Sequence, residues 1–122
     1  TLNPTVNKSR VIKVIEYISD HYMEDLRLDE LAGRFYVSQY YLCREFKKYT
    51  SRTINQYINT TRILNAQREI METNHPFSQV AANCGFASST HFSRVFRSVT
   101  GMTPTAFRKS CSQGQVTERK FS

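Results

Sequence analysis

Residues 85–108 read GFASSTHFSRVFRSVTGMTPTAFR, which describes a turn, a helix, a second turn and the start of another helix. Gly85 can adopt the positive φ of a tight turn, and the serines that follow can cap a helix. Phe92 and Phe96 are four residues apart and give that helix one buried face. The GMTP segment at 101–104 ends it and begins the next helix, because Thr caps helices and Pro fits their first position. This stretch therefore predicts a compact helical unit.

A similar pattern lies 50 residues earlier, around SQYYLCREFKKYT at residues 38–50. The pairs at this offset are Ser38/Ser88, Leu42/Phe92, Arg44/Arg94, Phe46/Phe96, Lys47/Arg97, Thr53/Thr103 and Tyr57/Phe107. Just upstream the offset is 49, with the pairs Leu31/Val80, Ala32/Ala81, Phe35/Cys84 and Val37/Phe86. The chain therefore contains two similar helical units, and the second has one extra residue in its turn.

Apolar periodicity and capping signals divide the remaining chain into helices. The predicted helices cover residues 8–23, 28–35, 38–50, 53–72, 77–84, 88–100 and 103–110. Residues 1–9 are polar and predict a linker, and 112–122 have no apolar periodicity and predict a flexible tail. We therefore expect an all-α fold of about seven helices. The two helix-turn-helix subdomains are expected at 8–52 and 73–111. A long helix at 53–72 is expected to join them, and the flexible tail covers 112–122.

Each unit has the layout of a helix-turn-helix motif. A short helix carries an apolar residue followed by Ala32 or Ala81, and the small side chain lets a second helix cross close to the first. The turn between the two helices favours a residue that tolerates positive φ, which Gly85 supplies in the second unit. Tyr36 occupies the corresponding place in the first unit, so the sequence leaves that turn geometry open.

Composition excludes several classes of protein. The 122 residues are 39% hydrophobic, enough for one domain or two small subdomains with modest cores. No apolar run approaches the roughly 18 residues of a membrane span, and the N-terminus lacks the apolar core of a signal peptide. Cys43, Cys84 and Cys111 form no CxxC pair, which argues against a disulfide framework or zinc site and favours a reducing cytoplasm. We expect no cofactor and no metal.

The net charge of +7 is unevenly distributed along the chain. Residues 1–45 hold 6 basic and 7 acidic side chains, whereas 46–122 hold 11 basic and 3 acidic ones. No Asp or Glu lies between Glu72 and Glu118. A basic segment on a folded domain most often binds nucleic acid, and less often an acidic lipid surface or protein. A soluble surface that is simply basic stays an open alternative at this point.

Two arginines are the strongest candidates for contacts with bases. Arg44 and Arg94 lie two positions after Leu42 and Phe92, which turns them about 200° away from these core residues. They should be exposed, and an exposed Arg on a recognition helix can pair with guanine or phosphate. The alternative is an Arg that is solvated or held in an internal salt bridge. Lys47 and Arg97 follow the core phenylalanines of the same helices and are candidates for phosphate contacts.

The order of these residues resembles the C-terminal signature of the AraC/XylS-type transcription regulators, over about residues 11–110. The matching segments are Gly85-Phe86, Phe92-Ser93-Arg94-Val95-Phe96-Arg97, Gly101-Met102-Thr103-Pro104 and Phe107-Arg108. The resemblance implies a bacterial DNA-binding domain whose helices beginning near Ser38 and Ser88 enter major grooves. This sequence departs from the family pattern at Tyr36, in place of a turn glycine, and at Cys43, where a longer polar residue is commoner.

The resemblance also assigns roles to individual positions. The residues that match base-facing sites are Tyr40, Cys43 and Arg44 in the first unit and Ser89, Thr90, Ser93 and Arg94 in the second. The predicted phosphate contacts are Ser38, Tyr41, Lys47, Lys48, Ser88, His91, Arg97 and Arg108. Tyr40 and Tyr41 could equally pack, and the short polar residues could equally be ordinary surface.

The resemblance implies that the partner is the double-stranded DNA of a promoter, and we expect an activator that has RNA polymerase as a further partner. An effector or sensor domain is expected outside this chain. A membrane is not expected as a partner. The 20 residues of 53–72 would span about 30 Å as a helix, close to the roughly 34 Å of one DNA turn, so we expect recognition helices in successive major grooves. The alternative function is a helical protein-interaction module that uses its basic face. An enzyme is not expected, because the chain lacks a phosphate loop, HExxH and any supported nucleophile arrangement.

Overall fold

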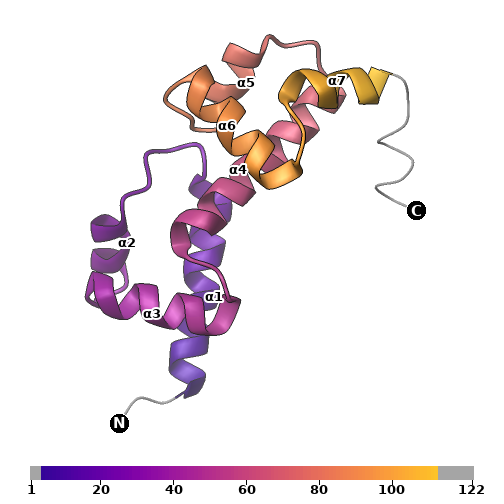
Figure 1. The fold of residues 1–122 in the computed structure, drawn as a ribbon. Helices are drawn as coiled ribbons and strands as arrows, with labels where there is room; N and C mark the ends of the chain where they lie inside the picture. Colours follow the sequence, from indigo (N-terminus) through magenta and orange to yellow (C-terminus); the bar gives the residue numbers. More distant parts are fainter. Residues whose placement is uncertain (1–3, 113–122) are drawn as a thin grey trace. The chain divides into compact units, whose positions relative to one another are not determined.

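The computed structural model describes residues 4–112, which form seven α-helices. These are α1 (Pro4–His21), α2 (Leu28–Arg34), α3 (Gln39–Thr50), α4 (Ile54–Glu72), α5 (Phe77–Asn83), α6 (Ser89–Thr100) and α7 (Pro104–Ser112). Figure 1 shows their order along the chain. The predicted all-α fold is confirmed for this range. The predicted tail, apart from Ser112, lies outside the described residues.

The first helix begins earlier than the sequence predicted. The predicted linker at residues 1–9 is wrong from Pro4 onward, because α1 starts there and not at Lys8. Proline fits the first position of a helix, where its missing N–H removes no hydrogen bond and its φ is already helical. At the other end α1 stops at His21, two residues before the predicted Met23, and the N–H of Glu24 donates to the carbonyl of His21 in the turn that follows.

The chain divides into two compact units within α4, after Thr61. The first unit therefore contains α1, α2, α3 and the first part of α4. The second contains the rest of α4 with α5, α6 and α7. The sequence had assigned all of 53–72 to a separate linking helix, whereas each part of α4 supplies buried residues to the core of its own unit.

In the first unit, α3 runs across α1 next to α2 (Figure 1). The core of this unit consists of Val11, Val14, Ile18, Leu31, Ala32, Leu42, Phe46, Ile54 and Ile58. Ala32 lies in α2 where this helix meets α3, as the helix-turn-helix layout predicted. The packing leaves one side of α3 to the core and the other to the surface.

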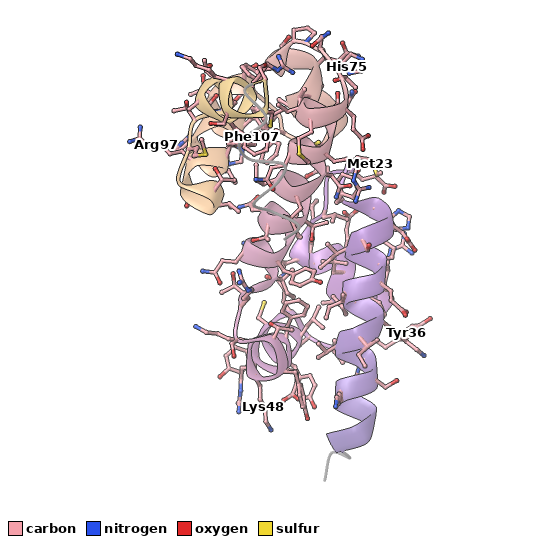
Figure 2. The ribbon with its side chains drawn as sticks, turned by 90° about the vertical axis from the view of Figure 1, so that its right-hand side faces the viewer. Met23, Tyr36, Lys48, His75, Arg97 and Phe107 are labelled. Atoms are coloured by element: carbon pink, nitrogen blue, oxygen red, sulfur yellow. The ribbon has the colours of Figure 1, made fainter. Side chains whose placement is uncertain are left out.

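In the second unit, α6 packs against both α5 and α7. Its centre is a row of aromatic rings, in which Phe86, Phe92, Phe96 and Phe107 follow one another with centroids 5.4–5.6 Å apart. Such edge-on and tilted ring contacts stabilise the unit beyond the gain from burying the rings. Cys84 is also buried. Figure 2 shows Phe107 within this unit.

Both units end their central helices with the same hydrogen bonds. The hydroxyls of Thr50 and Thr100 each donate to a phenylalanine carbonyl four residues back, at 2.8 Å. The residues that follow, Ser51 and Gly101, have positive φ and donate their N–H to the carbonyls of Lys47 and Arg97, again at 2.8 Å. The repeat seen in the sequence therefore extends to the backbone.

Candidate nucleic-acid interface

The two candidate recognition helices, α3 and α6, begin with equivalent caps. The hydroxyl oxygen of Ser38 accepts a hydrogen bond from the N–H of Tyr41 at 3.1 Å. The hydroxyl oxygen of Ser88 accepts one from the N–H of His91, also at 3.1 Å. Each cap satisfies one of the N–H groups that a helix start leaves unpaired. The hydroxyl hydrogen of each serine can still donate to a phosphate, which is the contact predicted for both residues.

The turns before α3 and α6 have the same geometry, although one holds tyrosine and the other glycine. Tyr36 has φ +59° and Gly85 has φ +95°, both in the left-handed region. The next residue in each turn donates its N–H to the carbonyl of the alanine in the short helix before it. Val37 donates to Ala32 at 3.1 Å, and Phe86 donates to Ala81 at 2.9 Å. The departure at Tyr36 therefore leaves the backbone of the motif intact, and the tyrosine ring is 95% exposed.

On α3, most of the predicted contact residues share one exposed side. Tyr40, Arg44, Lys47 and Lys48 are exposed, and Figure 2 shows Lys48 projecting from its unit. Their spacing of three and four residues places them on one face of the helix. Cys43 lies between them and is half-buried against the core, so it is less exposed than its neighbours on this face, and its contact with a base stays a prediction.

Tyr41 occupies a different environment from its neighbour Tyr40. It is half-buried, and the guanidinium of Arg10 in α1 lies over its ring at 5.8 Å. The ring therefore packs within the first unit. The hydroxyl contact to phosphate predicted for Tyr41 stays a prediction.

On α6, the exposed predicted residues are Ser89, Thr90, Ser93, Arg94 and Arg97. Arg97 points away from its unit in Figure 2. His91 is half-buried, with its ring edge-on to Phe86 at a centroid distance of 5.6 Å. The α6 surface thus offers short polar side chains near its start and arginines further along.

The cations on these two helices have no carboxylate partner within residues 4–112. The ion pairs His21–Glu24, Arg27–Asp29 and His75–Glu69 all lie outside α3 and α6. In the Arg27–Asp29 pair, the hydrogen bond between the side chains raises the pKa of Arg27 and lowers the pKa of Asp29. The internal salt bridge considered for Arg44 and Arg94 is therefore not formed, and their charge is available to an external anion.

Arg108 differs from the other predicted phosphate contacts, because its guanidinium is engaged within the second unit. It donates to the carbonyl of His75 at 2.8 Å and lies over the ring of Phe77 at 4.4 Å. These contacts join α7 to the start of α5 and to the segment before it. A phosphate contact by Arg108 stays a prediction, and the structure gives the side chain a second, structural role.

Sequence reasoning missed one feature of this surface. A pocket of about 560 Å³ opens beside α3 in the first unit, and its lining includes five predicted contact residues: Tyr40, Cys43, Arg44, Lys47 and Lys48. The other lining residues are Leu28, Thr53, Ile54 and Asn55. The stripe 40, 43, 44, 47, 48 is visible in the sequence, but the apolar residues that complete the pocket come from α2 and α4. Nothing in the sequence joins these three segments.

Comparison with known proteins finds a domain family that matches this chain and several transcription regulators that are similar to it. The helix-turn-helix domain family matches residues 31–110. The HTH-type transcriptional activator RhaS of Escherichia fergusonii is 32% identical over 101 residues, which are 83% of this chain and 36% of RhaS. This chain spans little more than a third of the length of the curated relatives it matches.

Two solved structures have the same fold. The DNA-binding domain of AdpA, in complex with a target DNA, has a TM-score of 0.81 and 28% identity, covering 86% of this chain and 95% of that one. A transcriptional regulator of Chromobacterium violaceum, described among AraC-type DNA-binding domain-containing proteins, has a TM-score of 0.79 and 26% identity. That match covers 89% of this chain and 97% of the other. No helix within residues 4–112 combines the length and the apolar character needed to cross a membrane.

Proposed function

Because the chain belongs to the AraC family of helix-turn-helix domains, we propose that it binds double-stranded DNA and reads its sequence through α3 and α6. The observation that carries this proposal is the pair of equivalent helices. Both are capped by serine, and both expose an arginine at the same position, Arg44 or Arg94. Domains of this family regulate transcription and are not catalytic.

The side chains divide into two groups by their expected contacts. Arg44 and Arg94 are the proposed base readers, since the guanidinium fork matches the two acceptors of guanine in the major groove. The other proposed base-facing residues are Tyr40, Cys43, Ser89, Thr90 and Ser93. Lys47, Lys48, Arg97 and Arg108 would neutralise phosphates, and the cap serines, Tyr41 and His91 would donate hydrogen bonds to phosphate oxygens. Phosphate contacts position a protein on the duplex, whereas base contacts specify the sequence.

The two units differ in their exposed residues, so the proposed site on DNA is asymmetric. Tyr40, Cys43 and Lys48 correspond to Thr90, Ser93 and Ser98 at the offset of 50. We propose that the helices enter successive major grooves of one duplex. Inserting five base pairs between the two parts of a selected site rotates one part to the far side of the duplex. Affinity should then fall, and full affinity with one protein per duplex would contradict this proposal.

Regulation of transcription by a larger protein is the wider proposal. RhaS is described as an activator, so activation, with RNA polymerase as a partner, is the proposed outcome of binding here. Since the chain spans little more than a third of its relatives, an effector or sensor domain is proposed elsewhere in the same protein. Promoter binding would take place in the bacterial cytoplasm.

The direct test is selection of bound sequences from a random duplex pool, followed by fluorescence anisotropy with the selected duplex. Affinity should decrease with salt, because each neutralised phosphate releases counterions. Polyglutamate serves as the control for the alternative function, a protein-interaction module. Binding to polyglutamate as tight as to the selected duplex, with no enrichment of any sequence, would refute DNA recognition.

A further inference from the structure

The pocket beside α3 combines apolar walls with positive charge. Its least exposed lining residues are Ile54, which is buried, and Leu28 and Cys43, which are half-buried. The ring of Tyr40 adds an exposed aromatic wall. A volume of about 560 Å³ lies within the range of roughly 300–1,000 Å³ that is typical of small-molecule sites.

Three cations line the same pocket, namely Arg44, Lys47 and Lys48. None of them pairs with a carboxylate in the described part of the chain. A free phosphate or sulfate would satisfy these charges but leave the apolar walls in contact with water. A neutral apolar molecule would cover the walls but leave the cations without a counter-charge. The complementary ligand has an apolar body and one anionic end.

We propose that this pocket binds a hydrophobic carboxylic acid with an aryl or alkyl body. The body would lie against Leu28, Cys43 and Ile54, and the carboxylate would accept hydrogen bonds from Arg44, Lys47 or Lys48. Bonds between a charged donor and a charged acceptor are the stronger ones, so the acid should bind better than its neutral analogue.

The position of the pocket gives the ligand a regulatory effect, and this part of the inference rests on the proposed function. Five of the nine lining residues are predicted DNA contacts, so a bound acid and DNA would use the same side chains. The acid would therefore lower DNA affinity. Thermodynamic reciprocity requires DNA to lower the affinity for the acid by the same factor.

The second unit serves as an internal control. At the offset of 50, Tyr40, Cys43 and Lys48 are replaced by Thr90, Ser93 and Ser98, and Ile54 by Pro104. These replacements remove the aromatic wall, the thiol and one cation. The acid should therefore perturb the first unit and leave the corresponding residues of the second unit unaffected.

The test is an NMR titration of the whole chain with 4-phenylbutyrate, using 4-phenylbutyramide and butyrate as matched probes. Saturable shifts are expected at the amides of Cys43, Lys47, Ile54 and Asn55, but not at Ser93, Arg97 and Thr105. The amide and butyrate should bind at least about tenfold more weakly, because each lacks one half of the complementarity. Equal binding of the acid and the amide, or shifts in both units, would overturn the proposal.

Two variants sharpen this test. Asn55 is exposed, lines the pocket and is not a predicted DNA contact, so Asn55→Trp should fill the pocket and weaken binding of the acid about tenfold or more. Thr105→Trp, at the corresponding exposed position of the second unit, should leave the affinity for the acid unchanged. If Asn55→Trp leaves that affinity unchanged as well, the acid does not bind in this pocket.

Competition with DNA is measured separately by anisotropy of the selected duplex. The acid should lower DNA affinity for the unmodified chain and have a smaller effect on Asn55→Trp. If the acid binds by NMR but leaves DNA affinity unchanged, the regulatory part of the inference is wrong. If the chain binds no duplex at all, the proposed function fails, while the NMR titration still decides whether the pocket binds the acid.

Discussion

Replacing Tyr36 by glycine should stabilise the first unit. Tyr36 has φ +59° in the turn before α3, and its ring is 95% exposed. A side chain other than glycine in the left-handed region costs about 1–2 kcal/mol. Glycine offsets part of this gain, because its greater freedom in the unfolded chain costs about 0.4–1 kcal/mol. Since the exposed ring leaves little packing to lose, Tyr36→Gly should raise the free energy of unfolding by about 0.5–1 kcal/mol.

The assay is hydrogen exchange resolved by residue, with Phe46 reporting on the first unit and Phe96 on the second. Tyr36→Gly should slow exchange at Phe46 and leave Phe96 unchanged. Tyr36→Ala keeps a Cβ and therefore the strain, so it should give no stabilisation. Gly85→Ala introduces the same strain into the second unit, and after the same offset for glycine in the unfolded chain it should destabilise that unit by about 0.5–1 kcal/mol. If Tyr36→Gly speeds exchange at Phe46, the tyrosine makes contacts that outweigh its strain, and the reasoning is refuted.

Three further predictions concern the second unit. Thr103 caps α7 by accepting the N–H of Ala106, so Thr103→Ala should cost about 0.5–2 kcal/mol in thermal unfolding without changing DNA affinity at low temperature; lost affinity in a folded variant would show a DNA contact. Arg108→Gln should destabilise the same unit and lower the salt slope of DNA binding by about one, because it removes the guanidinium charge; an unchanged slope would show that Arg108 does not contact a phosphate. Burial raises the pKa of the Cys84 thiol to about 11, so the unfolded state loses this proton first as pH rises. The stability that it contributes should decline between about pH 8.5 and 11, and Cys84→Ala, measured by urea unfolding, should show a weaker decline there; an equal decline would contradict a buried neutral thiol.

The helices were largely predictable, because their signals are local. Phe92 and Phe96 mark a buried face. Thr53 and Gln56 have the three-residue spacing of a capping box, and they form one at the start of α4 with hydrogen bonds of 2.9 and 3.0 Å in the two directions. The start of α1 was missed because residues 4–7 have no apolar periodicity. Pro4 at the first helical position was the one available signal.

Properties that depend on several segments were less predictable. The pair Ser51/Gly101 in the repeat could have indicated that Ser51 has positive φ, since the equivalent residue is a glycine that ends a helix. The contact of Arg108 with His75 joins residues 33 apart in sequence, and no local pattern encodes it. The exposure of Arg44 was predictable from helical periodicity, because it depends on one helix. The pocket beside it was not predictable, because its lining comes from three segments.

The central claim is that α3 and α6 each read part of one DNA sequence. The measurement that tests it most directly is the relative affinity for every single-base variant of the selected duplex, for the unmodified chain, Arg44→Ala and Arg94→Ala. Each arginine variant should lose about 1–3 kcal/mol of binding free energy for the selected duplex and relax the base preference at one position. The two positions should lie in different parts of the site. Equal weakening across all sequences, or loss of preference at the same position in both variants, would contradict the claim.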